Sequence, residues 1–379
     1  MRYVAGMGSR SMTPGAFRSY GLDVDIIDAD APQRWDDQVD ECLAHDAFHH
    51  WAYVTSVARG EVLLFVVRAG PESWVLPLEL ERIDVGELRD VVTARSPYGY
   101  SGPVWTAGWR PEATATAWLA VREALESLNV VTVLLRLHPS LPSTPTLPDG
   151  ALSRQEGDVV ILPLHDDDEA YWRQMRGGHR KNLRRASREG LVCAVDESPG
   201  AVSAFHAVYE QTMRRLDARG EYLFGVEVFR RLHSTQAFGA MIMAVDYKDS
   251  RLASGVFLHH GEHSHYFLSG SMPDRRFGSR PTRLMIHHAR SLLRDRGCTY
   301  MNLGGGVGAK RDALFEFKAE FSAQRATFNT VRWVVNADAY EKVCSARGVQ
   351  PAPTPAQGWF PAFLDPKIGV EAGVEDPRR

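Results

Sequence analysis

The stretch Tyr300-Met-Asn-Leu-Gly-Gly-Gly-Val-Gly-Ala-Lys-Arg-Asp-Ala-Leu-Phe-Glu-Phe-Lys-Ala-Glu-Phe321 predicts a strand that runs through consecutive glycines into a helix. Glycines at such a turn let backbone N–H groups approach an anion or a carbonyl group at a helix N-terminus. The alternative is a tight strand-to-helix turn without a ligand. The Gly-Lys-Ser/Thr of a Walker A loop is missing, and Gly304-x-Gly306-x-x-Ala309 lacks the acidic residue expected about 20 positions later. Nicotinamide and flavin binding are therefore not predicted.

Lys318 lies in this stretch among the aromatic residues Phe315, Phe317 and Phe321. A lysine on a largely apolar helix face is partly desolvated, which strengthens its field on a developing negative charge. The alternative is a lysine whose stem packs on the apolar face while its ammonium group reaches water. The sequence alone leaves both open.

A second chemical signal is the stretch from Tyr171 to Gly190, which holds seven basic residues and one acidic residue. Arg180, Arg184 and Arg188 recur every four positions and so share one helix face. Such a stripe can bind phosphates at fixed spacing, although it can also be a solvated helix face. The whole chain of 379 residues has a formal charge of −3, which excludes a generally basic nucleic-acid coat but not a local basic patch.

The surrounding sequence predicts an α+β fold of mixed, largely antiparallel sheets flanked by helices. Predicted strands cover 61–67, 74–80, 130–137, 158–164, 191–195, 240–246, 252–259, 264–270, 299–303 and 326–335. Predicted helices cover 112–128, a segment from Asp166 to Gly190, 200–217, 225–235, 279–296, 309–319 and 337–345. Four prolines within 138–150 place a boundary between domains 1–150 and 151–345. The Pro-rich tail 346–379 is expected to pack back on the N-terminal domain.

Other residues exclude several function classes. The run His259-His-Gly-Glu-His-Ser-His265 straddles a predicted hairpin turn, and the absence of a Cys pair or an HExxH helix favours a surface hairpin over a metal site. The sequence contains no Gly-x-Ser-x-Gly motif, so it does not support a serine hydrolase. The four cysteines lie far apart, and we see neither a secretory signal nor an apolar run long enough to span a bilayer. The sequence therefore predicts a cytoplasmic protein without a membrane span, and it leaves the oligomeric state open.

Three segments together resemble the FemABX family of aminoacyl-tRNA-dependent transferases, whose fold is related to that of GNAT acyltransferases. They are Arg95-Ser-Pro-Tyr-Gly-Tyr-Ser-Gly-Pro-Val104, the basic helix His179–Gly190, and the region from Tyr266 through Asn302-Leu-Gly-Gly-Gly306 to Phe317-Lys318. The resemblance covers roughly residues 50–335. It implies two tandem GNAT-like domains with a cleft between them. It also implies that an amine attacks the ester carbonyl of an aminoacyl-tRNA, so that an amide forms and the tRNA is released.

The resemblance also implies roles for individual residues. Lys318 would be the electrostatic catalyst, and Phe317 would stack near the terminal adenosine of the tRNA. The other residues expected to bind aminoacyl-tRNA are Arg180, Lys181, Arg184, Arg185, Arg188, Asn302, Gly304, Gly305 and Gly306. The acceptor would lie against Arg215, Tyr222 and Tyr266, unless these residues serve ordinary packing.

The partners expected from the resemblance are tRNA, as a co-substrate with no further cofactor, and a peptide or small amine acceptor. The acceptor would be a natural-product peptide or amine, as in antibiotic biosynthesis, or a peptidoglycan precursor of the cell wall. The alternative function is an acyl-CoA-dependent N-acyltransferase of the GNAT superfamily. The pyrophosphate loop of such enzymes is missing, since Arg275-x-x-Gly278-x-Arg280 fails at its last position.

Overall fold

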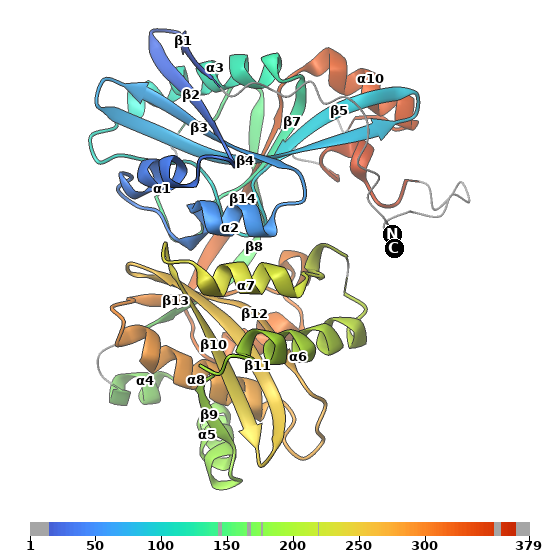
Figure 1. Ribbon diagram of the computed structural model, residues 1–379. Helices are drawn as coiled ribbons and strands as arrows, with labels where there is room; N and C mark the ends of the chain where they lie inside the picture. Colours follow the sequence, from blue (N-terminus) through green and yellow to red (C-terminus); the bar gives the residue numbers. More distant parts are fainter. Residues whose placement is uncertain are drawn as a thin grey trace.

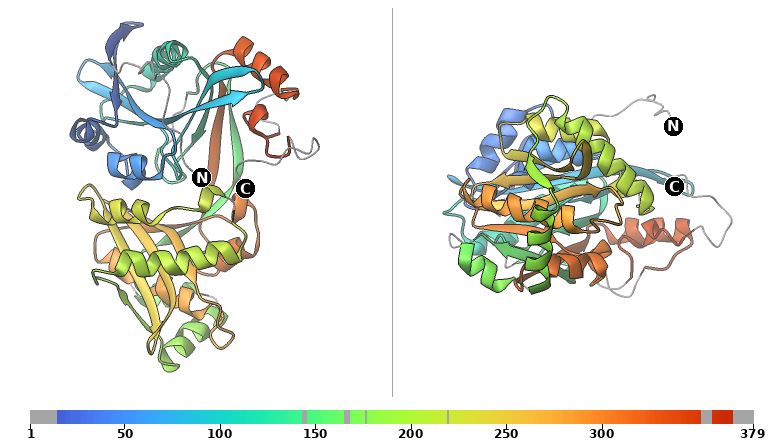
Figure 2. Two further views of the ribbon diagram at one scale, coloured as in Figure 1. Left: turned by 45° about the vertical axis from the view of Figure 1, so that its right-hand side comes forward. Right: turned by 90° about the horizontal axis from the view of Figure 1, so that it is seen from below.

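A computed structural model describes residues 15–142, 146–164, 168–175, 177–218, 220–351 and 358–368 (Figure 1). Two groups of helices and strands lie one above the other, and long strands run from one group into the other (Figure 2). We refer to the part from β1 to β7 as the N-terminal half and to the part from β8 to α9 as the C-terminal half. The predicted α+β class is confirmed.

One mixed sheet runs through both halves, and its described strands follow the order β1-β2-β3-β4-β5-β7-β14-β8-β13-β12-β11-β10-β9, with β6 on β4. In the N-terminal half the strands are Ala16–Ser19 (β1), Leu22–Asp28 (β2), Glu61–Ala69 (β3), Glu72–Val85 (β4), Leu88–Arg95 (β5), Val104–Trp105 (β6) and Val130–Arg136 (β7). The others are Ala151–Pro163 (β8), Val192–Val195 (β9), Gly239–Tyr247 (β10), Ser250–His260 (β11), His263–Ser271 (β12), Tyr300–Gly304 (β13) and Arg325–Val334 (β14).

In the N-terminal half, strand alternation gives each face of the sheet its own core. In β3, Val62, Leu64 and Val66 pack beside the helices Pro32–Asp40 (α1) and Trp51–Val57 (α2), which the 3-10 helix Ala47–His49 (η1) connects. The neighbours Leu63 and Phe65 face the opposite core, which the helix Pro111–Ser127 (α3) covers. Since successive side chains of a strand point to opposite faces, one apolar strand supplies both cores.

The C-terminal half is built in the same way. Met241 and Met243 of β10 pack in the core under the helices Asp168–Gln174 (α4), Gly177–Arg188 (α5) and Arg280–Arg294 (α8). Ile242 packs in the opposite core, under the helices Ala201–Arg215 (α6) and Val226–Ser234 (α7). The 3-10 helix Gly220–Tyr222 (η2) connects α6 with α7.

The two halves share both a core and a strand. Val54 of α2 and Phe229 of α7 belong to one hydrophobic cluster, so the halves pack directly against each other there. Strand β14 pairs with β7 of the N-terminal half and with β8 of the C-terminal half, and it follows the C-terminal half in sequence (Figure 2). The predicted division at residue 150 and the predicted cleft stay predictions.

Three predicted elements differ from the observed ones. The single helix predicted up to Gly190 is two helices, α4 and α5, although Gly190 itself has the positive φ of 84° expected after a helix end. The predicted start of that helix at Asp166 lies outside the described residues. The helix predicted over 309–319 is a 3-10 helix, Val307–Ala309 (η3), followed by the helix Ala313–Ala319 (α9). Strand β8 begins at Ala151 rather than at 158, because its polar first part pairs with β14.

After β14, the chain continues in the helix Ala337–Arg347 (α10), which packs on the N-terminal half. Tyr340 and Val343 of α10 share a cluster with Val85 and Val91. Phe363 of the 3-10 helix Ala362–Leu364 (η4) joins the same cluster, and the backbone N–H of Ala362 donates to the Tyr340 hydroxyl at 3.1 Å. The described part of the tail therefore lies against α10. Within the described ranges, no helix combines the length and the apolar character that a bilayer crossing needs.

Candidate active site at the end of the parallel strand pair

The site begins where the parallel strands β12 and β13 stop pairing. Their register runs through three residue pairs and ends at His265 and Asn302, although β12 continues to Ser271. On its other side β13 pairs with β8, with an irregularity between Asn302 and Gly304. Gly304 has a φ of 75°, a conformation that favours glycine. The backbone of β13 therefore turns away from its parallel neighbour at Gly304.

Lys318 of α9 lies directly against this turn. Asp312 caps α9 by accepting a hydrogen bond from the Phe315 N–H at 2.9 Å, which fixes where the helix begins. The Lys318 side chain is 8% exposed, and its Nζ donates to the Gly305 carbonyl oxygen at 2.7 Å. Burial lowers the pKa of Lys318 to about 8, while the charge of Asp312 partly opposes that shift. Of the two alternatives, the structure therefore shows a desolvated lysine and not one whose ammonium group reaches water.

The glycines of the turn allow close backbone packing around this amine. A Cβ atom on Gly304 would lie 3.2 Å from Lys318 Nζ, and one on Gly306 would lie 2.1 Å from the Lys310 carbonyl oxygen. Gly305 is similarly close to the backbone of Asp158. The glycines therefore permit a tight strand-to-helix turn, as the second sequence interpretation expected. The same turn presents the Gly305 carbonyl to Lys318.

Asn302 connects the turn to the N-terminal half. Its Oδ1 accepts a hydrogen bond from the Gly304 N–H at 2.7 Å, and its Nδ2 is buried without a hydrogen-bond partner among the described residues. Burial raises the pKa of Tyr100 to about 12, and the nearby Arg136 and Asn302 side chains partly offset that rise. Tyr100 belongs to the predicted Arg95–Val104 segment. This segment therefore meets the glycine turn across the junction of the halves.

A positive charge also lies at the junction. The field of Arg136, at the end of β7, acts on the hydroxyls of Tyr53, Tyr98 and Tyr100 and favours a lower pKa for each. Arg136 is partly buried and has no carboxylate within ion-pairing distance in the described part of the chain. An unpaired, partly desolvated guanidinium attracts an anionic group.

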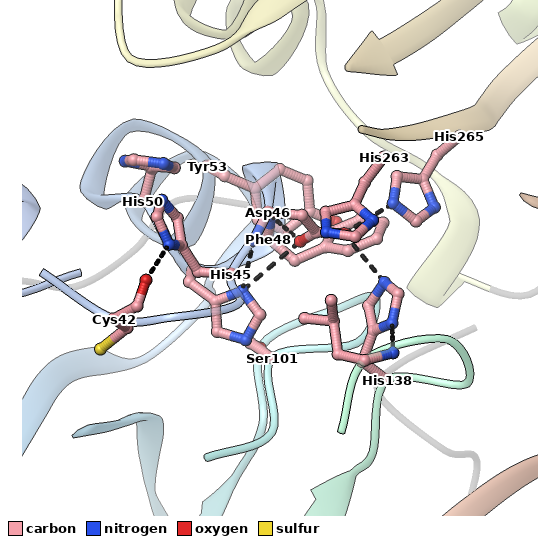
Figure 3. A network of polar contacts seen from close by, with 12 residues as sticks. Cys42, His45, Asp46, Phe48, His50, Tyr53, Ser101, His138, His263 and His265 are labelled. Carbon is pink, nitrogen blue, oxygen red and sulfur yellow. Dashed lines mark hydrogen bonds and ion pairs between the residues drawn. The ribbon is translucent and has the colours of Figure 1, made fainter. Parts of the chain in front are cut away.

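Beneath these residues lies a buried cluster of one carboxylate and two imidazoles. Asp46 Oδ2 is 2.7 Å from His265 Nε2 and 2.8 Å from His138 Nε2, and all three side chains are at most 3% exposed (Figure 3). Burial alone would raise the pKa of Asp46, but His138 and His265 hold it well below the usual value. Burial also lowers the pKa of His138 to about 4. The sequence predicted a surface hairpin here, but at His265 this hairpin is buried.

The predicted basic stripe lies on α5, but its members differ in their contacts. Arg180 Nη1 donates to the carbonyl oxygens of Trp172 and Met175 at 2.7 and 2.8 Å, so it caps the end of α4. Lys181, Arg184, Arg185 and Arg188 are exposed. The Arg184 guanidinium lies over the Trp172 ring, and Arg185 pairs with Glu189 at 2.8 Å. Arg176, in the same stretch, lies outside the described residues.

Phe317 and Lys318 face different surroundings. The Phe317 ring is partly buried beneath the Arg283 guanidinium, 4.9 Å from its centroid, and stands edge-on to Phe321. His179 of α5 contacts the Phe321 ring with centroids 4.3 Å apart. The basic helix therefore contacts the chain directly after α9, the helix that carries Lys318.

The three predicted acceptor residues are spread along α6, η2 and β12. Arg215 is exposed and its Nη2 donates to the Ser271 carbonyl oxygen at 2.8 Å. The Tyr222 ring lies edge-on to Tyr98 with centroids 6.2 Å apart. Tyr266 hydrogen-bonds through its hydroxyl to Ser269 Oγ. Tyr98 belongs to the same N-terminal segment as Tyr100, so Tyr222 lies at the junction of the halves.

The structure thus brings Lys318, Asn302 and the three glycines into one place, with the exposed cations of α5 on a neighbouring helix. No sequence pattern identified Tyr100, Arg136, Asp46 or His138 as site residues. Tyr100 lay within a quoted motif, but the other three have no local pattern that distinguishes them from ordinary packing residues. Their roles, like those predicted above, stay predictions.

Comparison with known proteins concerns the fold. A family model described as an acetyltransferase (GNAT) domain matches residues 173–328, which is less than half of the chain. A comparison with curated proteins gives no match.

Among solved structures, FemX aligns with a TM-score of 0.59 and 13% identity, over 82% of this chain and 98% of FemX. The C-terminal domain of a putative lysylphosphatidylglycerol synthetase from Agrobacterium fabrum aligns with a TM-score of 0.53 and 16% identity, over 83% of this chain and 94% of that domain. L-PGS from Bacillus licheniformis aligns with a TM-score of 0.51 and 11% identity, over 83% of this chain and 96% of L-PGS. At these identities the likeness shows the fold. The chain therefore has a GNAT-related fold like that of FemX. The match of residues 173–328 to an acetyltransferase domain supports the view that this protein is a transferase.

Proposed function

We propose that this protein transfers an amino acid from aminoacyl-tRNA to an amine of a peptide-type acceptor and forms an amide bond. The observation that carries the proposal is the buried ammonium group of Lys318, which points at the glycine turn where β12 and β13 separate. An amine that attacks an ester carbonyl builds negative charge on the carbonyl oxygen. A fixed, desolvated cation beside that oxygen stabilises this charge more than it stabilises the ground state.

The donor ester is already activated, so the protein has mainly to position the two substrates and stabilise the oxyanion. In the described structure one N–H of the Lys318 ammonium donates to the Gly305 carbonyl, and in the proposed reaction another of its three N–H groups donates to the developing oxyanion. A carboxylate on the acceptor could take the proton that the amine loses. Asn302, whose Nδ2 is unpartnered among the described residues, offers a further donor next to the same turn.

The tRNA would lie along α5. The exposed side chains of Lys181, Arg184, Arg185 and Arg188 present cations on this helix, whereas Arg180 acts mainly by capping α4. The contact of His179 with Phe321, two residues after the end of α9, holds α5 close to that helix. A phosphate backbone bound to α5 would therefore end close to the helix that carries Phe317 and Lys318. In this proposal Phe317 stacks near the terminal adenosine.

The acceptor would enter at the junction of the halves. Tyr222 lies there beside Tyr98, and the unpaired guanidinium of Arg136 would attract a carboxylate on the acceptor. Arg215 and Tyr266 are proposed to line the outer part of the same region. Both acceptor classes implied by the resemblance, natural-product peptides or amines and peptidoglycan precursors, carry suitable amines. A cytoplasmic location would suit either class.

The alternative donor is an acyl-CoA, which the GNAT-type fold also supports. One observation disfavours it. A pyrophosphate would need free N–H groups and positive charge at the start of α8, but Arg280 at that position pairs with Glu189 at 2.9 Å. The Glu189 carboxylate would repel a pyrophosphate at this helix end. The tRNA donor is therefore the better-supported proposal.

The decisive experiment supplies purified protein with a panel of radiolabelled aminoacyl-tRNAs or acyl-CoAs, together with peptide and amine acceptors. We expect amide product only from aminoacyl-tRNA, and we expect RNase treatment of the donor to abolish it. The Lys318→Met variant should lose at least about 100-fold in kcat. Lys342→Met is the matched control, because Lys342 is an exposed residue of α10 on the N-terminal half. Product from acyl-CoA alone would replace this proposal with the alternative.

A further inference from the structure

Four metal-ligating side chains converge at a second place on the junction, away from Lys318. Asp40 ends α1, His45 precedes η1, His50 is the residue before α2, and His260 ends β11. One donor atom from each of the four lies within 4.8 Å of the others. We call this set the junction histidine site. Three of its members come from the N-terminal half, and His260 comes from the C-terminal half.

The imidazole rings of this site pack against one another. The His260 ring centroid is 4.7 Å from that of His45 and 4.8 Å from that of His50, and His45 and His50 are 5.4 Å apart. The three rings therefore form one contiguous cluster to which both halves contribute. A neutral imidazole offers a ligand the lone pair of one ring nitrogen.

Hydrogen bonds fix which nitrogen carries that lone pair. His45 Nδ1 lies 3.1 Å from the Cys42 carbonyl oxygen, and His50 Nδ1 lies 3.2 Å from Asp36 Oδ1. Since a carbonyl and a carboxylate only accept, both Nδ1 atoms carry the proton. The two Nε2 atoms are then acceptors, and both are buried without a hydrogen-bond partner among the described residues. The His50 side chain is 1% exposed.

This pattern is typical of metal-binding histidines. Such a histidine donates its other ring N–H to a carboxylate or a backbone carbonyl, which holds the ring in the orientation that the metal requires. Here Asp36 and the Cys42 carbonyl occupy these outer positions. An unpartnered, buried Nε2 is costly unless something binds it.

The spacing of the donor atoms suits a tetrahedral ion. Asp40 Oδ1 lies 3.5 Å from His45 Nε2 and 3.9 Å from His50 Nε2. A tetrahedral zinc site with bonds of about 2.0 to 2.1 Å separates its donor atoms by about 3.4 Å. All four donor atoms lie within 4.8 Å of one another, so side-chain shifts of about 1 Å would bring them to that spacing. The Asp40 side chain has room to move because it is 60% exposed.

The buried Asp46 cluster, by contrast, does not suit a metal. His138 Nδ1 accepts hydrogen bonds from the N–H groups of Ser140 and Leu141 at 3.1 and 3.0 Å, so the proton lies on Nε2. His138 Nε2 lies 2.8 Å from Asp46 Oδ2. A metal bound there would require the ring to lose both protons. This cluster is therefore a hydrogen-bonded structural element.

We propose that Asp40, His45, His50 and His260 bind one divalent transition-metal ion, with zinc as the best match to three imidazoles and one carboxylate. The bound ion would connect α1 and η1 of the N-terminal half to β11 of the C-terminal half. It has no open coordination position and lies apart from the glycine turn, so its role is structural. The proposal does not depend on the proposed aminoacyl transfer.

The test uses the full chain, freed of metal with a chelator and then titrated with Zn²⁺ against a chromophoric chelator. We expect one equivalent of Zn²⁺ to bind and to raise the melting temperature. Co²⁺ should bind in its place and give the visible bands of a tetrahedral complex. Asp40→Asn and His260→Gln should each weaken Zn²⁺ binding by at least about 100-fold. Circular dichroism and gel filtration will show that both variants remain folded.

The matched control is His259→Gln, because His259 is the neighbour of His260 on β11 and points to the other side of the strand. It should leave Zn²⁺ affinity unchanged, and so should His265→Gln at the Asp46 cluster. Three results would overturn the proposal. They are no binding by the folded wild-type chain, equal binding by folded His260→Gln protein, and loss of binding in His265→Gln only.

Discussion

Replacing Lys318 with methionine should stabilise the protein near neutral pH while it removes catalysis. The buried amine has a pKa of about 8, against 10.5 for a free lysine, so the folded state holds its proton less tightly than the unfolded state. Below pH 8 this difference costs the folded state about 3 kcal/mol, and the cost vanishes above 10.5. At pH 10 it is about 1 kcal/mol. Loss of the hydrogen bond to Gly305 removes about 1 kcal/mol in the opposite direction.

The net expectation is that Lys318→Met raises the free energy of unfolding by about 2 kcal/mol at pH 7 and by almost nothing at pH 10. Urea denaturation at both pH values measures this, with Lys342→Met as the exposed control. In the wild type, kcat should fall as pH rises above about 8, because the ammonium group loses its proton. A Lys318→Met variant less stable than wild type at pH 7, or a gain that is equal at both pH values, would refute the reasoning.

Three further predictions concern other residues. Reversing the charges of Arg184 and Arg188 should weaken tRNA binding in filter assays and flatten its salt dependence. Arg180→Gln should instead destabilise the fold by about 1 kcal/mol, because the hydrogen bonds with which Arg180 caps α4 are lost. Equal effects of these variants on tRNA binding would contradict this prediction. Arg136→Gln should raise KM for carboxylate-bearing acceptors and leave KM for the donor unchanged, as steady-state kinetics will show. Between pH 6.5 and 4, wild-type stability should fall by about 3 kcal/mol through His138 alone, since the unfolded state takes up the proton first. That component should be absent in His138→Gln.

Local patterns predicted most of the fold. The strands β10, β11 and β12 and the helix α8 lie within a few residues of their predicted ranges, because alternation and helical periodicity continue over their whole length. The first part of β8 was missed because it is polar. It is a strand only because β14, more than 150 residues later, pairs with it. The split between α4 and α5 depends on an arginine that caps carbonyls five and eight residues away.

The candidate site, too, was only partly predictable from local sequence. Phe315 and Phe317 lie on the same short helix as Lys318, so the sequence made its desolvation one of two open alternatives, and the structure decides between them. The closeness of Asn302 to Tyr100, and of His50 to His260, joins residues about 200 positions apart. No local pattern encodes such contacts. They follow from the order of the strands and from the way in which the two halves pack.

The position of β14 has a consequence for how this chain folds during synthesis. Residues 325–334 form the strand between β7 and β8, so the centre of the sheet is synthesised after all other described strands. Until then both β7 and β8 present unpaired edges, which are prone to wrong pairing with other chains. A fragment that ends before residue 325 keeps these edges permanently. We therefore expect C-terminally truncated chains to aggregate, even though they retain every residue of the N-terminal half.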